Sequence, residues 1–189
     1  MKVLVLASSK AEAKTLDIYI TVITGTGLVQ AAAAASYAIA EHKPDVIVSA
    51  GSAGSFGRFQ IGDIVSFGSV ICPDNDLTRF GLAKGTALRA DGKKLSILPL
   101  SGNTDYILSS SSSFESGQNR LIGNIRPDAS DMEAYGAAYA AFLKGIPCFA
   151  IKMITDIIGE DLRLPDYTSR LCEMRDRLPG VIEENLALL

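Results

Sequence analysis

Two carboxylates stand where a folded chain could use them for acid–base or ligand-binding chemistry. Asp156 follows the apolar run 148–154 through Thr155. A carboxylate at the end of a buried strand needs a partner, and strand ends commonly form functional sites. Glu133 closes an S-x-x-E pattern over residues 130–133, which is typical of a capping box at the start of a helix. The alternatives are a structural cap at either position, or a functional carboxylate at Asp156 and an acceptor for a ligand diol at Glu133.

Two glycine-rich segments, 25–27 and 51–54, each follow a β-rich run. Glycines let backbone amides approach a ligand, and the hydroxyl of Ser52 adds a donor and an acceptor. The first segment lacks the third glycine of a dinucleotide fingerprint, because Gln30 stands there, and the second lacks the Gly-Lys-Ser/Thr of a P-loop. A tight turn and a ligand loop therefore both remain open for each segment.

The elements that must position these residues follow from hydrophobic patterning. Buried or β-rich runs predict strands over 3–7, 18–24, 45–50, 64–71, 95–100 and 148–154. Residues 28–42 predict an alanine-rich helix that Pro44 ends, and 131–144 carry apolar groups at helical spacing. A terminal helix, interrupted near Pro179-Gly180, is expected over much of 168–189, and the serine run from Ser109 to Ser113 is expected to be a mobile surface loop.

This alternation of strands and helices predicts an α/β fold in a single domain spanning residues 1–189. We expect a three-layer α/β/α architecture around a twisted, mostly parallel mixed sheet. Ligands bind such sheets beyond the carboxyl ends of the strands. Residues 25–27, 51–54 and 155–156 are therefore expected to meet at one edge of the sheet.

Composition narrows the classes of function. Lys and Arg total 18 against 21 Asp and Glu, for a net charge of −3, which argues against a dedicated nucleic-acid binder. No apolar run reaches the length of about 18 residues expected for a membrane span, so we expect a cytoplasmic protein without a membrane partner. A single histidine, His42, rules out a multi-histidine metal site, and three separated cysteines do not form a disulfide scaffold.

Taken together, these features resemble the nucleoside phosphorylase and nucleosidase superfamily, in particular its 5′-methylthioadenosine/S-adenosylhomocysteine nucleosidase branch. The resemblance covers most of residues 1–160 and rests on the order of six segments: 25–27, 44–45, 51–54, 61–65, 131–134 and 154–156. It implies the phosphorylase/hydrolase-like fold and cleavage of the N-glycosidic bond of a purine nucleoside. It also implies a homodimer and no metal or organic cofactor.

Carried over position by position, the resemblance assigns roles to three carboxylates. Asp156 becomes the general acid that protonates, or hydrogen-bonds to, N7 of the leaving purine, which requires a pKa raised by burial from about 4. Glu12 matches the carboxylate that activates the attacking water, and Glu133 accepts from the ribose hydroxyls. The other substrate-binding residues implied are Ser52, which positions the nucleophile, Ala53, Gly54, Tyr106 near the base, Met132 against the sugar, and Thr155.

The absence of arginines from the N-terminal part of the chain bears on the choice between hydrolysis and phosphorolysis. The phosphorylase branch holds phosphate with arginines that this chain lacks before Arg58, and Ser49 stands two residues before Gly51. A phosphate dianion would be poorly held without them, which favours water as the nucleophile. The chain also lacks a family segment between Glu12 and Ile18, and Lys152 stands where the branch often has Arg. A phosphorylase, a futalosine-type hydrolase and a catalytically inactive nucleoside-binding protein remain alternatives.

Overall fold

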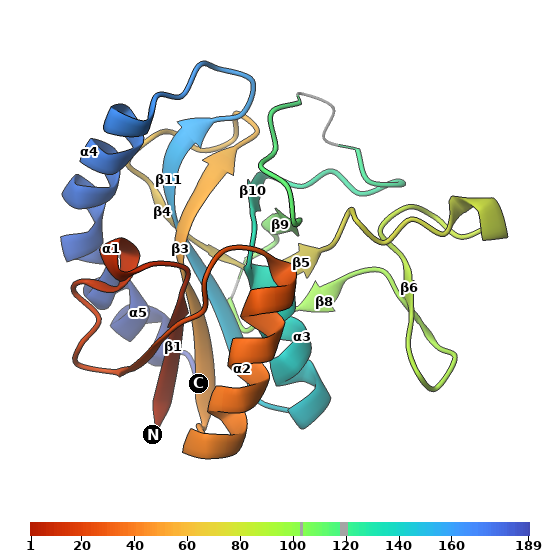
Figure 1. Ribbon diagram of the computed structural model, residues 1–189, viewed down its shortest axis with the longest axis horizontal. Helices are drawn as coiled ribbons and strands as arrows, with labels where there is room; N and C mark the ends of the chain where they lie inside the picture. Colours follow the sequence, from red (N-terminus) through yellow and green to blue (C-terminus); the bar gives the residue numbers. More distant parts are fainter. Residues whose placement is uncertain (103, 118–120) are drawn as a thin grey trace.

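A mixed, mostly parallel sheet with helices on both faces forms the body of the computed structural model, which describes residues 1–102, 104–117 and 121–189 (Figure 1). The central path of the sheet runs β2-β1-β3-β10-β9-β5-β8, and β11 pairs with β3 and β4. Its strands are β1 (Val3–Ala7), β2 (Ile20–Ile23), β3 (Val46–Ser55), β4 (Ile64–Phe67), β5 (Ser69–Ile71), β8 (Leu98–Pro99), β9 (Ile107–Ser110), β10 (Ala129–Asp131) and β11 (Cys148–Ile157).

The helices cover the two faces of the sheet, as the alternation of side chains along each strand requires. The helices are α1 (Lys10–Ala13), α2 (Leu28–His42), α3 (Ala134–Lys144), α4 (Leu164–Met174) and α5 (Leu178–Leu186). In β1, Leu4 and Leu6 belong to the core cluster that contains α2 and α3 residues. The intervening Val5 belongs to the cluster of α4 and α5. The helix predicted over 28–42 is confirmed, because α2 spans those residues.

A small arm projects from the body between β5 and β8 (Figure 1). It contains the 3₁₀ turn Thr78–Phe80 and the short hairpin β6 (Ala87–Leu88) and β7 (Lys94–Leu95). The predicted strand 64–71 is divided at Gly68, since β4 pairs with β11 whereas β5 joins β9 and β8.

The second glycine-rich segment is not the loop that the sequence suggested. Residues 51–54 continue β3, which is hydrogen-bonded to β1, β10 and β11. Close packing favours glycine there: a Cβ on Gly51 would lie 3.1 Å from Oε1 of Glu12, and a Cβ on Gly54 would lie 2.7 Å from Oδ2 of Asp156. The glycines therefore bring two carboxylates against the strand.

The prediction of a mobile surface loop is wrong for residues 109–111 of the serine run, whereas Ser112 and Ser113 are exposed and lie outside any strand. Ser109 and Ser110 lie in β9, and Ser109, Ser110 and Ser111 are buried. The hydroxyl of Ser110 accepts from the backbone N–H of Tyr135 at 3.1 Å, so a polar side chain is satisfied inside the core. Strand pairing with β5 and β10 overrides the composition of the run.

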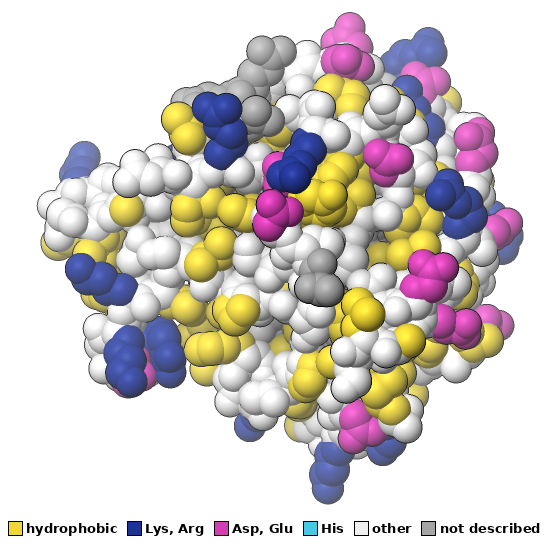
Figure 2. Space-filling model, turned by 180° about the vertical axis from the view of Figure 1, so that it is seen from behind, with side chains coloured by type: hydrophobic (Ala, Val, Ile, Leu, Met, Phe, Trp, Pro, Cys, Tyr) yellow, Lys and Arg dark blue, Asp and Glu magenta, His cyan; other side chains and the backbone are white. Residues whose placement is uncertain are grey.

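The terminal helix is interrupted, as predicted, but the break lies at Arg175–Arg177 and not near Pro179-Gly180. The chain passes from α4 through the 3₁₀ turn Arg175–Arg177 into α5, and Pro179 lies in the first turn of α5, where a missing N–H costs nothing. Among the described residues, no helix has the length and apolarity needed to cross a membrane. On the face seen in Figure 2, the described Lys and Arg side chains are dispersed among Asp and Glu rather than joined in one basic surface.

Candidate active site

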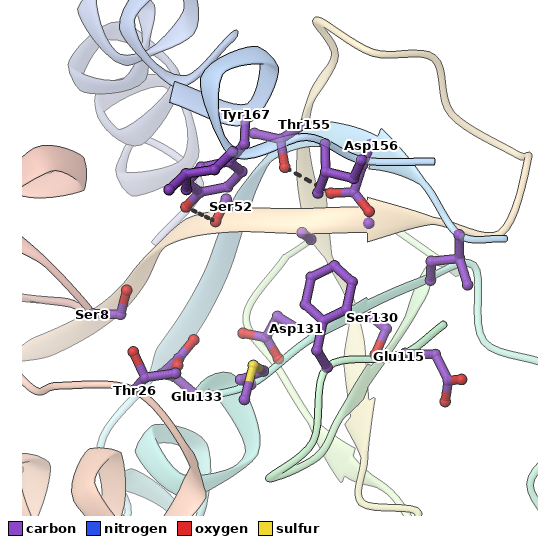
Figure 3. A pocket seen from close by; sticks show the side chains of 17 residues that line it. Ser8, Thr26, Ser52, Glu115, Ser130, Asp131, Glu133, Thr155, Asp156 and Tyr167 are labelled. Atoms are coloured by element: carbon purple, nitrogen blue, oxygen red, sulfur yellow. Dashed lines mark hydrogen bonds between the residues drawn. The ribbon is translucent and has the colours of Figure 1, made fainter. Parts of the chain in front are cut away.

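A pocket of about 360 Å³ opens at the end of the sheet where β1, β3 and β11 terminate (Figure 3). Its walls come from segments far apart in the sequence: Ser8, Thr26, Ser52–Gly54, Phe114, Glu115, 130–133, Thr155, Asp156, Ile158, Leu162, Leu164 and Tyr167. The predicted meeting of residues 25–27, 51–54 and 155–156 at one edge is confirmed, because Thr26, Ser52 and Asp156 all line it.

A β-bulge places Asp156 in the pocket. The pairing of β11 with β3 shifts between Ile154, opposite Ala53, and Asp156, opposite Gly54, which leaves Thr155 as the extra residue. The hydroxyl of Thr155 donates to Oδ1 of Asp156 at 2.9 Å. Burial raises the pKa of Asp156, whereas this hydrogen bond and the charge of Arg170 oppose the shift. The net effect favours the protonated, donating form of this carboxyl.

Glu133 faces the same pocket from the start of α3. It is the N-cap residue but makes no capping hydrogen bond; Oδ2 of Asp131 instead accepts from the N–H of Ala134 at 3.0 Å. Oε1 of Glu133 accepts from the backbone N–H of Gly27 at 2.9 Å. The capping-box alternative is therefore wrong, since Ser130 belongs to β10 and Glu133 reaches across to the glycine turn before α2.

The pKa of Glu133 is raised to about 7, first by burial and then by the neighbouring Asp131, while Lys152 and the Gly27 N–H oppose the shift. Lys152 lies in the interior of β11, with Nζ 2.8 Å from Oδ2 of Asp131 and 3.2 Å from Oγ of Ser49. Burial lowers the pKa of Lys152, but the charges of Asp131 and Glu133 raise it more, so its net direction is upward. The ammonium thus balances the charges of Asp131 and Glu133 in the pocket wall.

Glu12 lies directly behind the pocket wall and does not line it. Its carboxylate accepts four hydrogen bonds: Oε1 from the N–H and hydroxyl of Ser52, at 3.0 and 2.8 Å, and Oε2 from the N–H of Ser8, at 3.1 Å, and from its hydroxyl. The side chain is 2% exposed. Glu12 therefore acts on the pocket through two serines that do line it.

Tyr167 is a pocket residue that the sequence analysis missed. It comes from α4, and its hydroxyl lies 2.9 Å from Oγ of Ser52. Burial, and next the charge of Glu12, raise the pKa of Tyr167, which keeps its phenol protonated. Nothing in its local sequence marks it, because only the packing of α4 over β11 brings it to the site.

Most of the expected substrate-binding residues line the pocket, but Tyr106 does not. Ser52, Ala53, Gly54, Met132, Glu133 and Thr155 are all in its walls. The ring of Tyr106 instead packs edge-on against Phe59, 5.0 Å away, beneath the guanidinium of Arg58. The aromatic rings that do line the pocket are those of Phe114, directly after the serine run, and of Tyr167.

Arg58 is likewise outside the pocket and paired elsewhere, 3.1 Å from Oδ1 of Asp128. Of the described residues that line the pocket, none is a lysine or an arginine. In the described part of the chain, no three side chains of His, Cys, Asp or Glu are grouped so that they could hold a metal ion.

Comparison with known proteins gives consistent results at three levels. The Phosphorylase superfamily model matches residues 12–99. The 5′-methylthioadenosine/S-adenosylhomocysteine nucleosidase of Maridesulfovibrio salexigens is 32% identical over 157 residues, covering 74% of this chain and 68% of that protein. The enzyme of the same name from Exiguobacterium sp. is 30% identical over 159 residues, covering 75% and 68%.

Solved structures share the fold at lower sequence identity. The futalosine hydrolase of Helicobacter pylori superposes with a TM-score of 0.86 at 14% identity, covering 100% of this chain and 98% of that one. The S-adenosylhomocysteine nucleosidase of Streptococcus pyogenes, solved with 5-methylthiotubericidin, gives a TM-score of 0.82 at 21% identity, covering 98% and 96%.

Proposed function

The chain belongs to the phosphorylase superfamily, together with its 5′-methylthioadenosine/S-adenosylhomocysteine nucleosidases, and from this membership we propose that it hydrolyses the N-glycosidic bond of a purine nucleoside. The observation that carries the proposal is the position of Asp156: a buried carboxyl of raised pKa in the same pocket as Glu133 and the Glu12–Ser52 pair. These are the groups needed to protonate a leaving base, hold a sugar and take a proton from water.

The proposed reaction breaks the bond between C1′ of the sugar and N9 of the purine. The bonding electrons leave with the base, and the proton of Asp156 goes to N7, so that a neutral purine departs. Glu133 accepts hydrogen bonds from the sugar hydroxyls and holds the ring while C1′ gains positive charge. Stabilisation of such developing charge by fixed acceptors is the general source of catalytic power in sites of this kind.

Water then forms the new bond to C1′. A water that donates to the hydroxyl of Ser52 is linked to Glu12 through the 2.8 Å hydrogen bond between Ser52 and Oε1. The proton of the water passes along this link to the carboxylate; Glu12 then releases it to solvent, and Asp156 takes up a proton from solvent, so that both groups are restored. The products are a free purine and a free sugar, and water is the only co-substrate consumed.

Among the described residues, no lysine or arginine lines the pocket, which favours water over phosphate, because a phosphate dianion needs such partners. The test is release of free base from 5′-methylthioadenosine, S-adenosylhomocysteine, futalosine, adenosine, inosine and uridine, each with and without phosphate. We expect purine release that does not depend on phosphate. Strict phosphate dependence would identify a phosphorylase, and saturable binding without any base release would identify a nucleoside-binding protein.

We also propose that the protein is a cytoplasmic homodimer. Large apolar side chains exposed on α2 and on the arm support this, among them Val29 at 79%, Tyr37 at 72% and Phe80 at 80% exposure, since exposed apolar groups often mark interfaces. Sedimentation equilibrium should give twice the chain mass of 20.0 kDa. A single species at the chain mass would contradict the proposal.

A further inference from the structure

Helix α4 contacts the strand of the acid at the β-bulge itself. Nη1 of Arg170 donates to the backbone carbonyl of Thr155 at 2.7 Å. Thr155 is the extra residue of the bulge and is 1% exposed. The pairing of β11 with β4 covers only residues 150–153, so the bulge lies beyond the end of β4. A guanidinium from a helix therefore holds a buried carbonyl where the neighbouring strand has ended.

The face of α4 that carries Arg170 is fixed against the body of the protein. Residues three and four apart share one face of a helix, and this face carries Tyr167, Arg170, Leu171 and Met174. Leu171 and Met174 are buried in the core cluster that contains the apolar side chains of β11. The hydroxyl of Tyr167 lies 2.9 Å from Oγ of Ser52, and Figure 3 draws Tyr167 on the same side of the pocket as Thr155. Packing thus holds Arg170 against the bulge.

Arg170 acts on the peptide group that precedes the acid. The carbonyl that it holds belongs to the peptide unit between Thr155 and Asp156, and the hydroxyl of Thr155 donates to Oδ1 of Asp156 at 2.9 Å. A shift of this peptide group changes the direction in which the carboxyl leaves the backbone. Arg170 itself is not in the pocket wall, so its effect on a bound nucleoside passes through Thr155 and Asp156.

We propose that Arg170 is a positioning residue for the general acid: its guanidinium fixes the peptide group between Thr155 and Asp156 and so directs the carboxyl toward the leaving base. This inference rests on the proposed function. The extra residue of a bulge is left without a partner in the ladder, and a misplacement of about 1 Å in a catalytic group can cost about 10²-fold in rate. The charge-assisted hydrogen bond from Arg170 supplies the missing constraint.

The charge of Arg170 gives its position a measurable signature. It opposes the burial that raises the pKa of Asp156, so loss of this charge moves that pKa further upward. The other ionisable groups in the described walls of the two cavities beside the acid are themselves acidic: Glu115, Asp131, Glu133, Glu160, Asp161 and the phenol of Tyr167. A change in the titration of Asp156 on removal of a cation therefore reports on Arg170.

The test measures kcat and KM for adenine release from 5′-methylthioadenosine across pH in the unaltered protein and in Arg170→Gln. We expect kcat at its optimum to fall by about tenfold or more with a smaller change in KM, because the acid is displaced while the sugar contacts remain. The alkaline decline of kcat should also move to higher pH, because the charge that stabilised the carboxylate is gone.

Arg170→Lys keeps a cation and an N–H donor, and it should restore the alkaline limb and most of kcat. Arg163→Gln is the matched control, since this guanidinium pairs with Asp166 and is 80% exposed; its pH profile should equal that of the unaltered protein. Loss of kcat in Arg170→Gln with an unmoved alkaline limb and no relief by lysine is the result of a merely structural role and overturns the inference. Full activity of Arg170→Gln overturns it as well.

A second measurement separates failure of the inference from failure of the proposed function. The carboxyl of Asp156 is titrated by ¹³C NMR in the free proteins, and its resonance is assigned by its loss in Asp156→Asn. A midpoint that rises in Arg170→Gln but not in Arg170→Lys supports the placement of Arg170 beside the acid, and absence of adenine release then contradicts hydrolysis alone. Adenine release with an unmoved midpoint and unchanged kcat supports hydrolysis and overturns the inference.

Discussion

The ammonium of Lys152 lies 2.8 Å from Oδ2 of Asp131, and their side chains are 1% and 0% exposed. Loss of one partner from such a pair leaves an uncompensated charge in the interior. We expect Lys152→Met to lower the free energy of unfolding by about 3–5 kcal/mol, measured by denaturant titration. Lys144→Met, at the exposed end of α3, is the control. Equal stability of the two variants would contradict a structural role for the pair.

Asp156→Asn keeps the shape of the side chain but removes the acid. We expect kcat for base release to fall by about 10²–10⁴-fold with little change in nucleoside affinity, as for loss of a general acid. For the unaltered protein, kcat should decline on the alkaline side of the pH profile, because deprotonation of Asp156 removes the same donor. Asp105→Asn is a matched control, since that carboxylate is 86% exposed. A parallel loss in both variants would contradict the assignment.

Gly54→Ala tests the close approach of β3 to the acid. A Cβ at this position would lie 2.7 Å from Oδ2 of Asp156 and 2.9 Å from Cγ1 of Ile158, so the carboxyl must move. We expect kcat to fall by at least about tenfold, because small displacements of catalytic groups are costly. Gly180→Ala, in α5, meets no atom within 4 Å and should leave kcat unchanged. Full activity of Gly54→Ala would show that Asp156 need not keep this position.

The raised pKa of Glu133 predicts a pH dependence of stability. The unfolded chain releases this proton near the ordinary value of 4.5, whereas the folded chain holds it to about 7. The native state therefore binds more protons between these values, and stability decreases as the pH rises through that window. One site contributes a slope of at most about 1.4 kcal/mol per pH unit.

Removal of the carboxyl should remove this dependence. Glu133→Gln is expected to unfold with a flatter stability profile between about pH 5 and pH 7, outside which the two proteins differ by a constant amount. The measurement is the free energy of unfolding at several pH values, with the exposed Glu41→Gln as control. Identical slopes for Glu133→Gln and the unaltered chain would contradict the role of Glu133.

The sequence allowed candidate site residues to be predicted where they lie at the end of a strand. Asp156 and the glycine segments are marked by the apolar runs that precede them, and those runs fold as strands that end at the pocket. Tyr167 could not be predicted in this way, because it belongs to α4, a helix that is distant in the sequence from the strand that carries Ser52. Its contact with Ser52 spans 115 residues.

The prediction for the first residues of the serine run was wrong for a related reason. The composition of the run is that of a solvated loop, yet partners from β5, β10 and α3 bury Ser109 and Ser110 and satisfy their polar groups. Local composition carries no information about which strands will pair on either side.

The extra residue in β11, Thr155, changes the face of the sheet toward which the even-numbered side chains of the strand point. Upstream of it, Lys152 points toward Asp131 and Ile154 packs in the core cluster of α2 and α3, so even-numbered side chains face that layer. Downstream, Asp156 is also even-numbered, yet it lies against Gly54 and is influenced by Arg170 of α4, in the opposite layer. Deletion of one residue from this strand would therefore turn the carboxyl of Asp156 toward the layer of α2 and α3, although the carboxyl itself would be unchanged. Along β11 the residue count is as strictly determined as the identity of Asp156.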